Sequence, residues 1–233
     1  MKKNKLPIIA ALDNIDHEQI IPFIENDIPE ISTVKIGLEL FNRYGKDLLF
    51  QIESVVKKEY FLDLKLHDIP NTVHQAIYGL SGLNPKFLTI HLTGGRKMIE
   101  KALEARDKYL PATQILGVSY LTSLSEEEML DVWGKNKKEL MLMATQLANK
   151  TSIDGIVCSA EDLKDINNMI NNKIIVTPGI RAKGQKAQDQ QRIMSPEDAL
   201  RLGSDYLVVG RPLKDPIQKK QILKSVESFY LSQ

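Results

Sequence analysis

Short apolar runs alternate along the chain with longer stretches that have helical periodicity. Each run has the length of a strand that is buried on both faces of a parallel sheet. The pattern predicts strands at residues 7–12, 33–37, 60–65, 87–91, 113–119, 155–159, 174–177 and 206–210. It predicts helices near residues 17–25, 45–58, 71–83, 95–108, 125–149, 160–171, 195–202 and 215–231. The chain therefore repeats a strand-helix unit throughout its length.

Eight such units in a chain of 233 residues favour a (β/α)8 TIM barrel, with residues 1–233 forming a single domain. The alternative is a doubly wound open sheet, which usually has a glycine-rich turn after its first strand. Residues 7–14, Pro-Ile-Ile-Ala-Ala-Leu-Asp-Asn, contain no such turn. Helix starts are well marked, because Ser125 precedes three glutamates and Ser195 precedes Pro196.

The composition is that of an ordinary globular protein, with 42% hydrophobic and 26% charged residues. A net charge of +1 gives no electrostatic sign of a nucleic-acid or anionic-membrane partner. The apolar run behind the basic residues 1–5 stops at Asp13, which is too short for a signal peptide, and no run approaches a membrane span. The single cysteine, Cys158, excludes an internal disulfide and fits a reducing compartment. We expect a cytoplasmic protein.

The most informative stretch is residues 61–72, where charged side chains interrupt an apolar strand. Asp63 and Lys65 are two residues apart, so the period of a strand places them on the same side. Asp68 follows where the strand should end, and Pro70 can open the next helix. Buried charges cost several kcal/mol each unless they are paired. An isolated Asp-x-Lys pair would be a structural ion pair, but three charges in this setting favour catalysis.

In a TIM barrel the active site lies at the carboxyl ends of the strands, and polar residues gather at these ends here. The residues at these positions are Asp13, Lys35, Asp63, Lys65, Asp68, Thr72, His91, Thr122, Arg181 and Arg211. Alternating charges keep one another ionised, can stabilise negative charge on a ligand carbon and can offer a proton. His91 has the alternative role of a hydrogen-bonded filler. No His/Cys cluster has metal-ligand spacing; three carboxylates could hold Mg²⁺, but the lysines between them compete for that role.

The ends of the last two predicted strands have the features of a phosphate site. Gly179 and Gly210 allow close backbone approach, while Arg181 and Arg211 can supply guanidinium forks. For either loop alone, tight turns and solvated arginines explain the residues equally well. Residues 182–192 are polar and lack apolar periodicity, which fits either a lid over a phosphorylated ligand or a solvated loop.

The motif Asp-x-Lys-x-x-Asp-Ile-Pro-Asn-Thr at residues 63–72 resembles the signature of the orotidine 5′-phosphate decarboxylase family. The resemblance continues, in the right order, through residues 11–13, 34–37, 121–123, 177–181, 189–190 and 209–212. It implies a homodimer that converts orotidine 5′-phosphate into uridine 5′-phosphate and CO₂, the last step of de novo pyrimidine biosynthesis, without metal or cofactor.

The resemblance also implies a role for each matched residue. Lys65 would donate a proton to C6 of the pyrimidine, Asp63 would lie against the substrate carboxylate, and Lys35 would orient Asp63 and touch the ribose. The other implied substrate contacts are Asp13 with the ribose, Thr122 with the base, Gln190 with base and phosphate, and Arg181, Gly210 and Arg211 with the phosphate, alongside Ile69, Pro70, Asn71 and Pro178. Asp68 and Thr72 would enter the site of the neighbouring subunit.

Two other functions remain open at this point. One is a magnesium-dependent relative on the same barrel, such as keto-gulonate-phosphate decarboxylase, in which the shared Asp-x-Lys-x-x-Asp typically continues as Ala-Gly. The other is a catalytically silent nucleotide-binding barrel that serves as a sensor. Intact Asp63, Lys65 and Asp68 argue against this third function.

Overall fold

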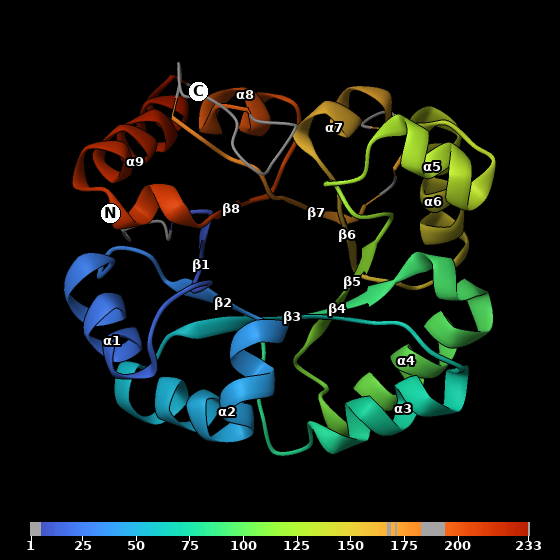
Figure 1. The fold of residues 1–233 in the computed structure, drawn as a ribbon, viewed down its shortest axis with the longest axis horizontal. Helices are drawn as coiled ribbons and strands as arrows, with labels where there is room; N and C mark the ends of the chain where they lie inside the picture. Colours follow the sequence, from blue (N-terminus) through green and yellow to red (C-terminus); the bar gives the residue numbers. More distant parts are fainter. Residues whose placement is uncertain (1–5, 167–168, 171, 183–193, 233) are drawn as a thin grey trace.

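The computed structural model describes residues 6–166, 169–170, 172–182 and 194–232. Within these residues, eight parallel strands follow one another around a closed barrel, and the last strand pairs with the first (Figure 1). The strands are β1 (Ile8–Ala11), β2 (Thr33–Gly37), β3 (Glu59–Leu66), β4 (Phe87–His91), β5 (Gln114–Val118), β6 (Gly155–Val157), β7 (Ile174–Thr177) and β8 (Tyr206–Val209). The predicted TIM barrel is confirmed.

Helices form the outer ring around the strands (Figure 1). They are α1 (His17–Pro22), α2 (Leu38–Gln51), α3 (Pro70–Gly79), α4 (Gly95–Tyr109), α5 (Glu126–Trp133), α6 (Lys137–Lys150), α7 (Ala160–Ile166), α8 (Pro196–Arg201) and α9 (Pro216–Leu231). Four short helical turns, η1 (Phe23–Asp27), η2 (Ile52–Val56), η3 (Leu92–Gly94) and η4 (Arg211–Lys214), lie next to them. In the part of the chain that the structure describes, no helix has the length and apolar character needed to cross a membrane.

Two apolar clusters hold the barrel and its helices together. The larger cluster packs the outward faces of the strands against the helices. The smaller one fills the barrel with side chains from Ile9, Ala11, Phe61, Phe87, Leu116, Val176 and Val208. Burial of each large apolar side chain contributes roughly 1.5–3 kcal/mol. Because apolar side chains fill the interior, a polar site has room only at the carboxyl ends of the strands.

Two of the predicted helices differ most from the structure. The predicted helix at 125–149 is two helices, because Gly134 takes the left-handed conformation (φ 62°) after α5 and Asn136 caps α6 with Glu139 in a capping box. The helix predicted from residue 45 begins at Leu38, directly after β2, and bends at Gly45. Both differences leave the strand-helix order unchanged.

Candidate active site

A cavity of about 460 Å³ opens at the carboxyl ends of the strands. Ten of the residues predicted from the sequence line it: Asp13, Lys35, Asp63, Lys65, Thr122, Pro178, Gly179, Arg181, Gly210 and Arg211. Ala11, Phe61, Val118, Val157 and Val208 line its apolar part. Seven different strands or the loops after them contribute to this lining. The structure thus brings together side chains that are up to 198 residues apart in the sequence (Asp13 to Arg211).

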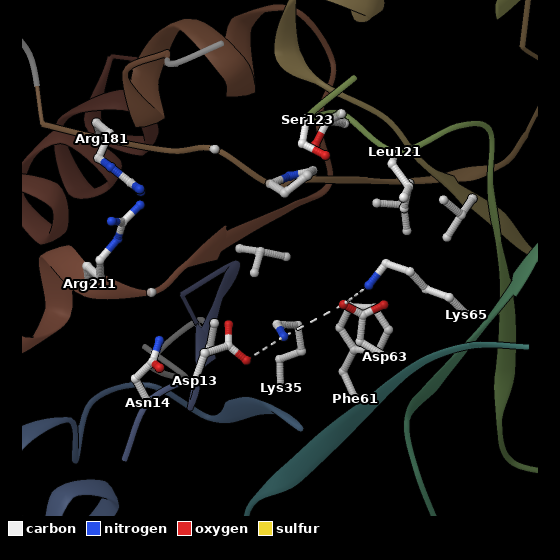
Figure 2. A pocket seen from close by; sticks show the side chains of 18 of the residues that line it. Asp13, Asn14, Lys35, Phe61, Asp63, Lys65, Leu121, Ser123, Arg181 and Arg211 are labelled. Atoms are coloured by element: carbon white, nitrogen blue, oxygen red, sulfur yellow. Dashed lines mark hydrogen bonds and ion pairs between the residues drawn. The ribbon is translucent and has the colours of Figure 1, made fainter. Parts of the chain in front are cut away.

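Four alternating charges form a chain across one side of the cavity (Figure 2). Lys35 Nζ lies 3.1 Å from Asp13 Oδ1 and 3.6 Å from Asp63 Oδ2, and Lys65 Nζ lies 2.7 Å from the same Asp63 oxygen. The side chains of Lys35 and Asp63 are 10% and 13% exposed, whereas that of Lys65 is 31% exposed. Asp63 links the two lysines, and Lys65 is the more exposed of these lysines in the cavity lining.

Gly37 at the end of β2 makes room for this charge chain. A Cβ at that position would lie 3.2 Å from Lys35 Nζ and 3.3 Å from Asp13 Oδ1. A side chain there would press against both partners of the ion pair, which would have to shift by a few tenths of an ångström. The glycine therefore fits the close approach of Lys35 and Asp13.

The surroundings of Asp63 favour its ionised form. Burial acts in the opposite direction and raises the pKa, but the charges of Lys35 and Lys65 and the hydrogen bonds from Lys65 and Thr89 outweigh it. The pKa of Asp63 is therefore lowered below its usual value. The carboxylate stays charged and holds both lysines in place.

Lys65 lies in an irregular part of β3. Leu62 pairs with Leu88 and Leu66 pairs with Ile90, so the register between β3 and β4 shifts across the three residues between the leucines. Lys65 has a positive φ of 47°, which is unusual for a residue with a side chain. Its backbone N–H donates to Thr89 Oγ1 at 2.9 Å. The side chain is therefore placed by a β-bulge as well as by strand alternation.

His91 does not line the cavity but lies beside the charge chain. Its ring centroid is 5.1 Å from that of His67. Burial, followed by the charges of His67 and Lys65, lowers the pKa of His91 to about 4. A neutral imidazole at neutral pH agrees with a role as a filler next to Lys65.

Two arginines face each other on the other side of the cavity (Figure 2). Arg181 follows β7 and Arg211 follows β8, and Arg181 Nη1 donates to the carbonyl of Ile180 at 2.8 Å. Gly179, with φ of 82°, makes the turn that leads to Arg181. Two neighbouring cations favour an anion between them, and a phosphate suits the fork geometry of guanidinium groups.

Some predicted residues do not meet in this cavity. Asp68, Ile69, Pro70, Asn71 and Thr72 do not line it; they lie at the start of α3, where Ile69 is 67% exposed. The Asp68 carboxylate accepts a hydrogen bond from the N–H of Ile69 at 2.6 Å. Gln190 and the rest of residues 183–193 lie outside the described residues.

Sequence reasoning missed several residues of the site. Thr89 is fully buried and touches both Asp63 and Lys65. Lys214 donates to the carbonyls of Asp13 and Asn14, at 2.9 and 2.8 Å, and so ties the loop after β1 to η4. A lone hydroxyl inside the apolar strand 87–91 was the available signal for Thr89. The sequence holds no comparable signal for Lys214.

A model of the family described as Orotidine 5′-phosphate decarboxylase / HUMPS family matches residues 6–224. The chain belongs to this family. It is 42% identical over 214 residues to the orotidine 5′-phosphate decarboxylase of Staphylococcus saprophyticus. This alignment covers 89% of this chain and 90% of that protein. The corresponding protein of Dictyoglomus turgidum is 36% identical over 230 residues, covering 95% and 94% of the two chains.

Solved structures agree with this membership in the orotidine 5′-phosphate decarboxylase / HUMPS family. The crystal structure of orotidine 5′-phosphate decarboxylase from Lactobacillus acidophilus superposes with a TM-score of 0.79 at 31% identity. The match covers 96% of this chain and 98% of that one. The likeness predicted from the sequence motifs is confirmed at the level of the family.

The donor set of this family member can be compared with the needs of a metal ion. Lys35 Nζ occupies the place between Asp13 and Asp63 that a shared cation would need. Over residues 6–166, 169–170, 172–182 and 194–232, no group of three or more His, Cys, Asp or Glu side chains has the arrangement of a metal site. The charges that balance the cavity carboxylates are therefore the lysine ammonium groups.

Proposed function

We propose that this protein decarboxylates orotidine 5′-phosphate to uridine 5′-phosphate and CO₂, as the last step of de novo pyrimidine biosynthesis in the cytoplasm. The observation that carries the proposal is the position of the buried Asp63 between two lysines, opposite a pair of arginines across one cavity. A nucleotide fits this arrangement, with its phosphate at the arginines and its base at Lys65. The names of the relatives agree with it.

The reaction breaks the bond between C6 and the carboxylate and leaves the electron pair on C6. No conjugated acceptor is available to that pair, so the barrier is very high, and enzymes on the hardest reactions remove upwards of ~20 kcal/mol. Fixed positive charge beside C6 supplies the largest share of the stabilisation. Lys65 is the more exposed of the two lysines that line the cavity, and we assign to it the proton that goes to C6.

Asp63 has two tasks in this proposal. Its negative charge lies against the substrate carboxylate, and this repulsion disappears when CO₂ leaves. At the same time it holds the ammonium of Lys65 at 2.7 Å, so the proton donor needs no rearrangement during the reaction. Lys35 keeps Asp63 oriented from the other side. No cofactor is needed for this chemistry.

The remaining lining residues bind the substrate. Arg181, Gly210 and Arg211 hold the phosphate, Asp13 and Lys35 the ribose, and Thr122 and Pro178 the base. Gln190, which lies outside the described residues, is assigned to base and phosphate by the family resemblance alone. Binding energy from the distant phosphate orients the base against Lys65. This division places affinity at one end of the cavity and chemistry at the other.

We also propose that the enzyme is a homodimer in which Asp68 and Thr72 complete the site of the partner. These residues lie at the exposed start of α3 and do not line the cavity of their own chain. Mixing Lys65→Ala and Asp68→Ala proteins tests this. Mixed dimers keep one site with neither substitution, so the mixture should regain activity. A mixture no more active than its two components would contradict a shared site.

The magnesium-dependent reaction on sugar phosphates is the competing function within the family. The continuation Asp68-Ile69-Pro70-Asn71-Thr72, in place of Ala-Gly, favours the nucleotide. The sensor is disfavoured because its function would not require the partly buried Asp63–Lys65 pair.

A direct assay tests the proposal. Purified protein treated with EDTA is mixed with orotidine 5′-phosphate, and the ultraviolet absorbance of the substrate is followed. We expect the absorbance to fall and uridine 5′-phosphate to appear by chromatography. Turnover of orotidine 5′-phosphate that is lost with EDTA and restored by Mg²⁺ would contradict a metal-free reaction. No turnover of orotidine 5′-phosphate under either condition would contradict the proposal: turnover of keto-gulonate phosphate with Mg²⁺ would then support the metal-dependent alternative, and binding of the nucleotide without turnover would support the sensor.

A further inference from the structure

The hydroxyl of Thr89 joins the two reactive residues of β3 from the neighbouring strand. Thr89 Oγ1 accepts from the backbone N–H of Lys65 at 2.9 Å and donates to Asp63 Oδ1 at 3.0 Å. The residue is 0% exposed, so water does not compete for these bonds. One buried oxygen therefore contacts both members of the ion pair.

The two bonds fix the direction of the hydroxyl hydrogen. An amide N–H can only donate, so Thr89 Oγ1 must accept from Lys65, and its own hydrogen is then free for Asp63. An ionised carboxylate is an acceptor only, which matches this direction. The arrangement thus favours the charged form of Asp63, in agreement with its lowered pKa.

The backbone of Lys65 explains why a side chain from β4 is needed. The register shift between Leu62 and Leu66 interrupts the regular pairing of β3 with β4 at this point. Lys65 also has the unfavourable φ of 47°. Thr89 Oγ1 takes the place of a carbonyl acceptor for its N–H, because a buried N–H without a partner is costly. The hydroxyl therefore stabilises the backbone conformation that aims Lys65 into the cavity.

Both oxygens of Asp63 are fixed as a result. Oδ2 faces the ammonium groups of Lys65 and Lys35, at 2.7 and 3.6 Å, and Oδ1 accepts from Thr89. Removing the Thr89 bond would allow the carboxylate to rotate about its terminal torsion, which is broad for Asp. Rotation would carry Lys65 Nζ away from its position.

We infer that Thr89 is a positioning residue of the active site, whose hydroxyl holds the Asp63 carboxylate and the Lys65 backbone in the arrangement that the reaction uses. This inference rests on the proposed function for its kinetic consequence. Its structural content concerns Asp63 and Lys65 alone and can be measured without substrate.

The test compares Thr89→Val, which removes the hydroxyl at nearly constant volume, with Thr89→Ser, which keeps it. We expect Thr89→Val to lower kcat about 10–100-fold with KM within threefold, and Thr89→Ser to stay within about threefold of wild type in both, since misplacement near the chemistry costs on this order. The acidic limb of the kcat profile should also move to higher pH in Thr89→Val, because Asp63 loses a hydrogen bond that favours its charge.

Thr113→Val is the matched control. Thr113 is also buried, and its hydroxyl donates to the carbonyl of Pro85 at 2.7 Å, just before β5 at the opposite end of the barrel. It should lose stability but leave kcat unchanged. A Thr89→Val enzyme with wild-type kcat, or a Thr89→Ser enzyme as impaired as Thr89→Val, would overturn the inference. The second result would indicate packing by the methyl group.

A substrate-free measurement separates this inference from the proposed function. The pKa of Asp63 is followed by carboxyl ¹³C NMR in wild type, Thr89→Val and Thr89→Ser. We expect a higher pKa in Thr89→Val alone, and equal values in all three would overturn the inference whatever the substrate is. If Thr89→Val does not fold, Thr89→Ala and Thr89→Ser give the same comparison. A wild type that leaves orotidine 5′-phosphate intact while Asp63 responds as expected would refute only the proposed function.

Discussion

The two ends of the barrel carry similar charged residues with different partners. At the amino end, Asp154 Oδ2 accepts from the N–H of Ile115 at 2.7 Å and from Arg106 Nη1 at 2.6 Å. Arg106 Nη1 also donates to the carbonyl of Thr113 at 3.0 Å. At the carboxyl end, Asp63 accepts from Lys65 and Thr89, and the chain of charges borders the cavity.

This difference separates charges that support the fold from charges that support chemistry. The Arg106–Asp154 pair is hydrogen-bonded to the backbone where β5 begins, and so it stabilises the position of this strand. In the Asp63–Lys65 pair, the Lys65 side chain is 31% exposed beside a cavity that a ligand can enter. The same residue types therefore stabilise the protein in one place and act on substrate in the other. Substitutions at each end test whether the two charge pairs have these separate roles.

The largest effect is expected for Asp63→Asn. The neutral amide removes the counter-charge that both lysines share, so the ammonium of Lys65 is no longer held beside the base. We expect kcat to fall by about 10³-fold or more, in line with the loss of a preorganised electrostatic group. Steady-state kinetics measures this, and circular dichroism checks the fold. A kcat within about tenfold of wild type would show that the charge chain is not central to turnover.

At the amino end of the barrel, the corresponding substitution is Arg106→Met, which removes the counter-charge of Asp154. It leaves Asp154 half-buried without its counter-charge, and we expect the free energy of unfolding to fall by about 2–4 kcal/mol. Because the pair lies far from the cavity lining, kcat should stay within about twofold of wild type. Urea unfolding and the decarboxylation assay measure the two quantities. A large loss of kcat in a stable protein would contradict the separation of the two ends.

Arg211→Ala tests whether the arginine end of the cavity binds phosphate without taking part in the chemistry. The guanidinium is expected to bind phosphate and not to take part in the chemistry, so the dissociation constant for uridine 5′-phosphate should rise about 10–100-fold. Isothermal titration calorimetry measures the change. Arg96→Ala is the control, since Arg96 is an exposed residue of α4 that pairs with Glu100. Equal affinity in Arg211→Ala and wild type would rule out a phosphate site at this arginine.

The smallest effect concerns His91 and pH. Burial lowers the pKa of this imidazole from 6.5 to about 4, so the unfolded chain takes up a proton at a higher pH than the folded protein. The stability due to neutral His91 is complete above pH 6.5 and is lost as pH falls toward 4. Allowing for solvent around the partly exposed ring, we expect a loss of roughly 1–2 kcal/mol over this range.

Urea unfolding at several pH values, compared between wild type and His91→Asn, isolates this contribution. Asp63 acts in a different window, because a carboxyl with a lowered pKa loses its stabilising effect only below its unfolded value of 3.8. The difference between the two proteins should therefore appear between pH 6.5 and 4. Parallel stability curves for both proteins would contradict a buried neutral His91.

Most of the fold could be predicted because each strand is a short apolar run and each helix is amphipathic. The break in the region 125–149 was also readable, since Gly134 is a helix-ending residue and Asn136 with Glu139 matches a capping box. The break was not predicted because the apolar residues continue with helical periodicity across it. The positions of Asp13, Lys35, Asp63 and Lys65 followed from the rule that barrel sites lie at the carboxyl ends of strands.

The contacts that orient these residues could not be predicted. A period of two placed Asp63 and Lys65 on one side, but the bulge and the positive φ of Lys65 depend on the register between β3 and β4. The role of Thr89 depends on the same register. Lys214 meets Asp13 only because the barrel closes and brings residues 201 positions apart into contact.

A single-turnover experiment with Lys65→Ala tests directly whether Lys65 donates the proton to C6. The variant is mixed in excess with orotidine 5′-phosphate, binding is followed by tryptophan fluorescence or filtration, and the absorbance of the substrate reports its consumption. We predict that the nucleotide binds and remains intact, because the phosphate end is unchanged and the proton donor is gone. Consumption of the bound substrate at the wild-type rate would show that Lys65 is not the proton donor.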